Sequence, residues 1–204
     1  MLITVPKDGG LLPTFRMTEQ PEVITKGTYG SAVTVNISFG KEDVIQWLES
    51  LQSPYPLIMA DSDWLNRSPK AVEILIKKKI PVGLLGKAGI AYEEDPSLLE
   101  KEIQGFEKVF EKKPLWFRTA DEEFSDGLRQ SLYQHEINAL GSSVFWSTTG
   151  QKPKLGKGDI LSIPYHRDEK ISFKSIDSLR SSHDFHSVED VIFGVSVKTK
   201  KYPQ

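Results

Sequence analysis

The 204-residue chain contains no cysteine. This absence excludes disulfide bonds, thiolate nucleophiles and zinc sites built on cysteine, but it does not decide the compartment. Long apolar runs are also missing, and residues 1–10 have neither a basic start nor an apolar segment of useful length. We therefore expect no transmembrane segment and no signal peptide. Either the protein is cytoplasmic, or the sequence starts after an export segment that has been removed.

Neither sign of charge is in excess, because 26 Lys and Arg oppose 28 Asp and Glu for a net charge of −2. This balance gives no electrostatic reason for a nucleic acid or an anionic membrane as a partner, and we predict no nucleic-acid binding. Hydrophobic residues make up 38% and charged residues 26%, which is typical of a soluble globular protein. The length is sufficient for one domain with a full core.

Short apolar runs alternate with helical periods from Ser31 onward. The apolar runs predict strands at 33–38, 57–60, 82–85, 115–118, 137–142 and 158–163. The helical periods predict helices at 41–51, 69–79, 96–112, 125–135 and 173–181, followed by a short apolar segment at 185–188 and a tail at 195–198. This alternation predicts an α/β fold of parallel strands joined by right-handed crossovers. Periodicity alone leaves a small β/α barrel and an open doubly wound sheet nearly tied.

The domain organisation follows from the same change of pattern at Ser31. Residues 1–30 are rich in Gly, Pro and Thr and predict an irregular lead-in with one short strand around 22–25. Residues 31–204 predict a single domain.

Several short motifs follow one another in a defined order. Thr-Val-Asn-Ile-Ser-Phe-Gly occupies 34–40, Trp-Leu-Asn-Arg-Ser-Pro-Lys-Ala-Val occupies 64–72, Lys-Pro-Leu-Trp-Phe-Arg occupies 113–118, and a Gly-x-Ile strand begins at 158. This order resembles the polysaccharide deacetylase family, the NodB homology domain of carbohydrate esterase family four. The first motif is similar to Thr-Phe-Asp-Ile-Ser-Trp-Gly of a sporulation-associated branch. The resemblance covers residues 22–192, and it implies a distorted (β/α) barrel of about seven parallel strands.

The resemblance also implies which residues stand at the family's active site. Family members hold a divalent metal with one aspartate and two histidines, and they use a neighbouring aspartate as the base. Asn36 stands at the base and Ile37 at the metal-binding aspartate, whereas Leu85 and Gly89 stand at the two histidines. Only the family's arginine is retained, as Arg118.

These replacements remove the family chemistry from the aligned positions. A neutral amide such as Asn36 is not a general base, and Ile37, Leu85 and Gly89 carry no donor atom for a metal. We therefore expect no cofactor and no metal there. We interpret the chain as a degenerate deacetylase-like protein that binds a glycan, such as peptidoglycan or a chitooligosaccharide, or that serves as a scaffold with an envelope or spore protein.

An alternative stays open. The chain is then an active hydrolase of carbon–nitrogen, non-peptide bonds that deacetylates an N-acetylated glycan with a relocated site around Asp61, Asp63, Arg118 and His166. The family's late histidine aligns with Pro164, which leaves His166 two positions late. Between the two, the sequence favours a protein without deacetylase activity.

Other polar and aromatic residues have simpler interpretations. Asp61 and Asp63 follow a strand, where capping of the next turn is their commonest role. His183 and His186 are predicted to be exposed loop histidines rather than metal ligands. Trp47 lies outside the apolar stripe of its helix, so it is the best candidate for an exposed aromatic that stacks on sugar.

Arg118 needs a new partner if Asn36 has replaced the catalytic aspartate. A guanidinium does not lose its proton, so it requires another anion or contact with water. We expect a replacement ion pair with one acid of Asp121, Glu122 and Glu123, or with the loop of Asp61 and Asp63, unless the guanidinium holds a free anion.

Overall fold

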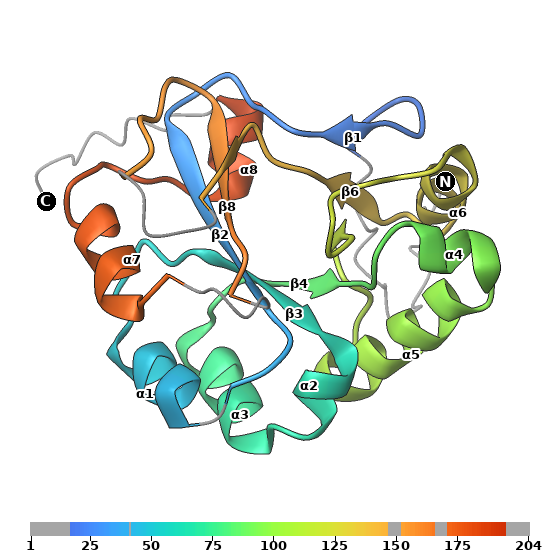
Figure 1. Cartoon of the computed structure of the whole chain (residues 1–204), viewed down its shortest axis with the longest axis horizontal. Coiled ribbons are helices and arrows are strands. Elements are labelled where there is room, and N and C mark those ends of the chain that lie inside the picture. Colours follow the sequence, from blue (N-terminus) through green and yellow to red (C-terminus); the bar gives the residue numbers. More distant parts are fainter. Residues whose placement is uncertain (1–16, 41, 147–151, 166–170, 195–204) are drawn as a thin grey trace, which may run out of the picture.

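The computed structural model describes residues 17–40, 42–146, 152–165 and 171–194. Within them, eight strands form one sheet in the order β1-β6-β5-β4-β3-β2-β8-β7, and each pair of neighbouring strands is parallel. The sheet curls into a half-barrel with β1 and β7 at its two edges (Figure 1). The predicted distorted (β/α) barrel is therefore confirmed. The strands are β1 (Val23–Ile24), β2 (Ser31–Ile37), β3 (Leu57–Asp61), β4 (Val82–Leu85), β5 (Trp116–Arg118), β6 (Asn138–Leu140), β7 (Val144–Phe145) and β8 (Asp159–Ile163).

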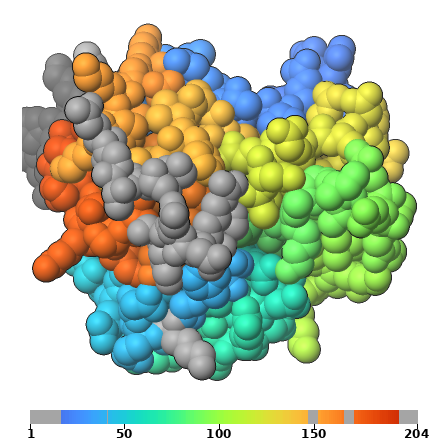
Figure 2. Space-filling model, viewed as in Figure 1, coloured from blue at the N-terminus to red at the C-terminus, as the bar shows by residue number. Residues whose placement is uncertain are grey.

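Helices join the strands and surround the sheet. They are α1 (Glu42–Ser50), α2 (Ser62–Asn66), α3 (Pro69–Lys78), α4 (Ile90–Glu94), α5 (Leu98–Phe110), α6 (Asp126–Gln134), α7 (Phe173–Arg180) and α8 (Val188–Phe193). The space-filling view shows α7, α1, α3 and the region of α4 to α6 following one another around the margin of one face (Figure 2). In the described part of the chain, no helix is long and apolar enough to cross a bilayer.

Strand alternation divides the interior into two cores. Successive side chains of a strand point to opposite faces of the sheet. On β2, Val33, Val35 and Ile37 belong to the large core between sheet and helices, whereas Ala32 belongs to a smaller core inside the half-barrel. The side chains of Thr34 and Asn36 point to that inner side, which we call the lumen.

The predicted elements agree with the structure to within two residues at their ends. The lead-in contains its predicted short strand as β1, which pairs with β6 at an edge of the sheet. The sequence patterns did not predict α2, α4 or β7, and they predicted only an apolar segment where α8 forms. The helices α2, α4 and α8 have at most six residues, which is too short to show a helical period, and β7 has only two residues. The predicted tail at 195–198 lies outside the described residues.

Candidate functional site

The predicted site residues meet at the carboxyl edge of the sheet, which is where β/α barrels carry their active sites. Asn36 and Ile37 end β2, Asp61 ends β3, Leu85 ends β4 and Arg118 ends β5. The strand register places Asp61 opposite Leu85, and Leu85 opposite Arg118. Parallel pairing therefore brings together residues that lie far apart in the sequence.

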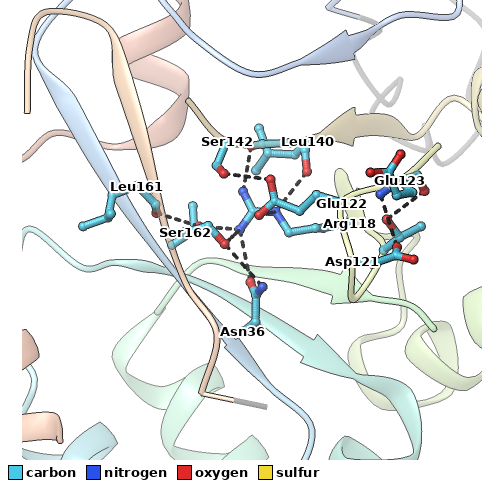
Figure 3. Close-up of polar contacts among 12 residues, drawn as sticks. Asn36, Arg118, Asp121, Glu122, Glu123, Leu140, Ser142, Leu161 and Ser162 are labelled. Atoms are coloured by element: carbon cyan, nitrogen blue, oxygen red, sulfur yellow. Dashed lines mark hydrogen bonds and ion pairs between the residues drawn. The ribbon is translucent and has the colours of Figure 1, made fainter. Parts of the chain in front are cut away.

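Arg118 is fully buried in the lumen, where its guanidinium is enclosed by acceptors (Figure 3). Its Nε donates to the carbonyl of Leu140 at 3.0 Å, and Nη2 donates to the carbonyl of Gly141 at 2.8 Å. The third nitrogen, Nη1, donates to three side-chain oxygens: Thr34 Oγ1 at 2.5 Å, Asn36 Oδ1 at 3.1 Å and Ser162 Oγ at 3.2 Å. Asn36 thus still contacts the retained arginine, but as a neutral amide.

The predicted replacement ion pair of Arg118 is confirmed, with Glu122 as the acid. Arg118 Nε lies 3.7 Å from Glu122 Oε1, and Glu122 Oε2 accepts a hydrogen bond from Ser142 Oγ at 2.7 Å. Burial lowers the pKa of Arg118 to about 10, and the Glu122 carboxylate opposes that shift. Arg118 therefore stays protonated at neutral pH.

The two residues at the family's aspartate positions face opposite sides of the sheet. Asn36 faces the lumen, where its Nδ2 also donates to Ser162 Oγ at 3.4 Å. Ile37 is fully buried in the helix-side core. An oxygen ligand at 37 would therefore start from a side chain that is directed into packed apolar groups, away from the lumen.

The two residues at the family's histidine positions are closely packed against other parts of the protein. Leu85 lies in the inner core with Met59 and Trp116. The Gly89 N–H donates to both carboxylate oxygens of Asp121, at 3.0 and 3.1 Å. A Cβ atom at Gly89 would lie 2.4 Å from the carbonyl oxygen of Glu123. The backbone of the β5–α6 loop therefore fills the space that a side chain at 89 would need.

The residues present at these positions do not fit the divalent metal that the family resemblance implies. Their side chains offer one neutral amide oxygen, and that oxygen already accepts from Arg118. Across the described residues, no group of three or more His, Cys, Asp or Glu side chains is arranged to hold a metal ion. A protein zinc site needs about three such ligands.

A second polar cluster lies at the rim of the half-barrel, and it begins at Asp61. Asp61 Oδ1 accepts the N–H of Trp64 at 2.9 Å, which confirms the predicted capping role at the start of α2. The other oxygen, Oδ2, accepts from Lys87 Nζ at 2.9 Å. Lys87 Nζ also lies 3.7 Å from Oδ2 of the exposed Asp63. Lys87 therefore places its charge between two acids, in the loop that connects β4 to α4.

The rim cluster continues inward to a buried carboxyl group. Glu102 on α5 is only 5% exposed, and its Oε2 accepts a hydrogen bond from the Tyr92 hydroxyl at 2.6 Å. The same hydroxyl accepts the backbone N–H of Lys87 at 2.8 Å. Burial raises the pKa of Glu102 to about 7, although Tyr92 and Lys87 oppose the shift, and the pKa of Tyr92 is raised too, first by burial and then by Glu102. We call Asp61, Lys87, Tyr92 and Glu102 the rim cluster.

Sequence reasoning missed the inner half of the rim cluster, although a signal was present. Glu102 falls between Leu99, Ile103 and Phe106 on the apolar stripe of its helix. A carboxyl group in such a stripe is rarely buried without a partner. That partner is Tyr92 on the preceding helix α4, which no local pattern identified.

The described members of the relocated site in the alternative interpretation each have other partners. Asp61 is paired with Lys87, whereas Arg118 is held in the lumen by other partners. Asp63 is exposed and contributes only the long contact to Lys87. His166 lies outside the described residues, so its part of the alternative remains a prediction.

The prediction that Trp47 is an exposed, sugar-stacking aromatic is wrong. Trp47 is 3% exposed, its indole N–H donates to Asp177 Oδ1 at 3.1 Å, and its ring stacks on Phe173 with centroids 4.4 Å apart. Both partners belong to α7, which is distant in sequence and covers this side of α1. His183 is exposed as predicted, whereas His186 is half-buried and packs against Tyr29.

Comparison with solved structures identifies the fold. A wild-type pseudoenzyme of carbohydrate esterase family 4 from Bacillus anthracis matches with a TM-score of 0.68 and 14% identity, over 84% of this chain and 69% of that one. Peptidoglycan deacetylase PdaC from Bacillus subtilis matches with a TM-score of 0.61 and 14% identity, over 80% of this chain and 90% of that one. By sequence, neither a family model nor a curated protein matches the chain.

The predicted resemblance is thereby confirmed for the fold. The chain has the NodB-type half-barrel that carbohydrate esterase family 4 uses, both in active deacetylases and in a pseudoenzyme. At these identities the likeness concerns the fold alone.

Proposed function

We propose that this protein is a non-catalytic member of the carbohydrate esterase family 4 fold that binds a glycan at the carboxyl edge of its sheet. The observation that carries the proposal is the packing at Gly89, where the Glu123 carbonyl occupies the space of a metal-binding side chain. In this proposal, metal binding is prevented by the position of the Glu123 backbone as well as by the lack of donor side chains.

The lumen supports the same proposal. In a working site, an arginine that positions a base needs a carboxylate in front of it. Here Arg118 faces the Asn36 amide, and its ion-pair partner is Glu122 on the following loop. Asn36 lacks the basicity to deprotonate water, and the described residues place no metal ligands beside it.

The proposed ligand class rests on the structural neighbours. PdaC is named as a peptidoglycan deacetylase, and another neighbour is a peptidoglycan N-acetylglucosamine deacetylase, with a TM-score of 0.66. A glycan of N-acetylated amino sugars, such as peptidoglycan or a chitooligosaccharide, is the corresponding ligand for this chain. A role at the bacterial envelope or spore, together with a protein of that structure, belongs to the same proposal and rests on the motif at 34–40.

Two measurements on the same preparation test the proposal. Isothermal titration calorimetry with an acetylated chitooligosaccharide and with peptidoglycan fragments should show binding. Acetate release from the same compounds should be absent, whether zinc or EDTA is present. Zinc-dependent acetate release would establish the active-hydrolase alternative instead, and the absence of binding to either glycan would leave a protein-binding scaffold.

Reinstalling the family donors offers a sharper test. One neighbour of this chain is a mutant of the Bacillus anthracis pseudoenzyme with restored enzymatic activity. In this chain we expect Ile37→Asp and Gly89→His not to restore metal binding or activity. The side chain at 37 is directed into the helix-side core, and a side chain at 89 meets the backbone of Glu123. A folded, zinc-binding and active quadruple variant with Asn36→Asp and Leu85→His would refute this explanation of inactivity.

A further inference from the structure

The β4–α4 connection, residues 86–89, is joined to the end of β5 by two backbone hydrogen bonds: the Gly86 N–H donates to the Arg118 carbonyl at 2.7 Å, and the Lys87 carbonyl accepts the Ala120 N–H at 3.0 Å. Three contacts that involve side chains add to them. The Tyr92 hydroxyl accepts the Lys87 N–H, the Lys87 ammonium is bound to Asp61, and the Gly89 N–H is bound to Asp121. Close packing adds to these contacts, because a Cβ atom at Gly86 would lie 2.0 Å from the Tyr92 hydroxyl oxygen. Tyr92 is therefore the contact that joins this connection to α4, beside its anchors on β5 and the β5–α6 loop.

Tyr92 is in turn held by Glu102. Its hydroxyl donates to Glu102 Oε2 at 2.6 Å, so a chain of two hydrogen bonds runs from α5 through Tyr92 to the backbone of Lys87. Glu102 is 5% exposed. If α4 moves away from α5, Tyr92 leaves Glu102, and the carboxyl group reaches water. The closed arrangement and the solvation of Glu102 are therefore mutually exclusive.

The geometry points to a pH-sensitive latch, in which neutral Glu102 holds Tyr92 and the 86–94 segment closed and ionised Glu102 favours their opening. The charged and titratable groups that face Glu102 come from each neighbouring element. They are Tyr92 on α4, Lys87 in the β4–α4 connection, and Asp61 and Asp63 at the β3–α2 junction. The two aspartates repel an ionised Glu102, whereas Lys87 and Tyr92 attract it. The latch does not depend on glycan binding.

The direction of the pH effect follows from the cost of burying a carboxylate. In the closed form the pKa of Glu102 is raised to about 7, chiefly by burial, whereas a solvated glutamate has its ordinary value of 4.5. The closed form is therefore fully favoured below the lower value. It loses its advantage as the pH rises from 4.5 to about 7, and the effect levels off above that. Within this window each pH unit raises the open fraction by up to about tenfold.

Hydrogen exchange measured by mass spectrometry tests the latch on the whole protein. Between about pH 5 and about pH 7.5, after correction for intrinsic exchange, protection of residues 86–94 should fall at least about tenfold in the wild type. Protection of β2, residues 31–37, should stay constant and thereby report on global unfolding. In Glu102→Gln, whose neutral amide still accepts from Tyr92, protection of 86–94 should not depend on pH.

The matched control is Glu100→Gln. Glu100 is exposed on the same helix, where its carboxylate accepts from Gln104 and lies 3.5 Å from His135 Nε2, so this variant removes a carboxylate of α5 that is not buried. It should keep the wild-type pH dependence. The latch is refuted if the wild type shows no fall, if Glu102→Gln shows the same fall, or if 31–37 falls in parallel.

A second variant keeps the latch testable if Glu102→Gln does not fold. Tyr92→Phe removes the hydroxyl that joins Glu102 to Lys87. At about pH 5 it should bring the protection of 86–94 down to the level that the wild type shows near neutrality. Full wild-type protection in Tyr92→Phe at acidic pH would overturn the proposal.

Discussion

The two polar clusters at the carboxyl edge of the sheet bury charge in different ways. In the lumen, Arg118 is enclosed by backbone carbonyls and neutral side chains, with Glu122 as its ion-pair partner. In the rim cluster, the Lys87 ammonium pairs with Asp61, and the Tyr92 hydroxyl joins the Lys87 backbone N–H to the Glu102 carboxyl group. The charge of the lumen cluster is constant across neutral pH because a guanidinium keeps its proton. The rim cluster changes its charge there, because the pKa of Glu102 is about 7.

This difference shows which part of the carboxyl edge holds the sheet together. Five hydrogen bonds from one fully buried side chain join β5 to β2, β6 and β8. The rim cluster instead holds one loop and a short helix. We therefore expect changes in the lumen to affect global stability most, and changes at the rim to be smaller and dependent on pH.

Arg118→Met should have the largest effect. It leaves the half-buried Glu122 carboxylate and the hydroxyl of Ser162 without their cation, so unfolding should be easier by about 3–5 kcal/mol. Urea denaturation measures the change. Arg129→Met is the control, because Arg129 is partly exposed and its ion pair with Asp126 is at the surface, where a loss below about 1 kcal/mol is expected. Equal effects in the two variants would contradict the structural role of the lumen cluster.

Glu102→Gln should come next, and its effect should change with pH. The raised pKa means that the wild type carries its full stability below 4.5 and loses up to about 3 kcal/mol, relative to the variant, as the pH rises to about 7. Thermal unfolding of both proteins at about pH 5 and about pH 7.5 measures the difference. A stability difference that is the same at both pH values would show that Glu102 is not buried as a titrating group.

Gly89→Ala should cost about 1–3 kcal/mol, because the added methyl group meets the Glu123 carbonyl oxygen, which is backbone and cannot turn away. Gly127→Ala is the matched control. A Cβ atom there meets nothing within 4 Å, and Gly127 lies within α6, so this variant should be more stable by about 0.5–1 kcal/mol. Chemical denaturation of both variants tests whether their changes in unfolding free energy have opposite signs. An unchanged stability in Gly89→Ala would mean that the β5–α6 loop moves to accommodate the methyl group at little cost.

Asn36→Asp should have the smallest effect. It places a carboxylate about 3.1 Å from Arg118 Nη1, and the attraction is offset by the cost of burying another charge, so stability should change by less than about 1 kcal/mol. Acetate release should stay absent, because a base alone does not activate water as a metal does. Activity in this single variant would show that the site needs only its base.

The sequence predicted most of the fold, because the longer elements carry clear periods. The five helices of eight or more residues and the six strands of three or more were located to within two residues. Its errors concern neighbours that are distant along the chain. Trp47 lies on the buried face of α1 with Val44 and Leu48, where α7 covers it, and the burial of Glu102 depends on Tyr92.

The sequence by itself determined the order of strands and helices and the lack of donor atoms at Ile37, Leu85 and Gly89, because periodicity and residue chemistry are local properties. It also required a new partner for Arg118, since a guanidinium keeps its charge. Only the tertiary structure decided that this partner is Glu122 and that the β5–α6 backbone fills the place of a side chain at Gly89. These outcomes depend on how loops from different strands pack together at one edge of the sheet, and no pattern within a single segment records that packing.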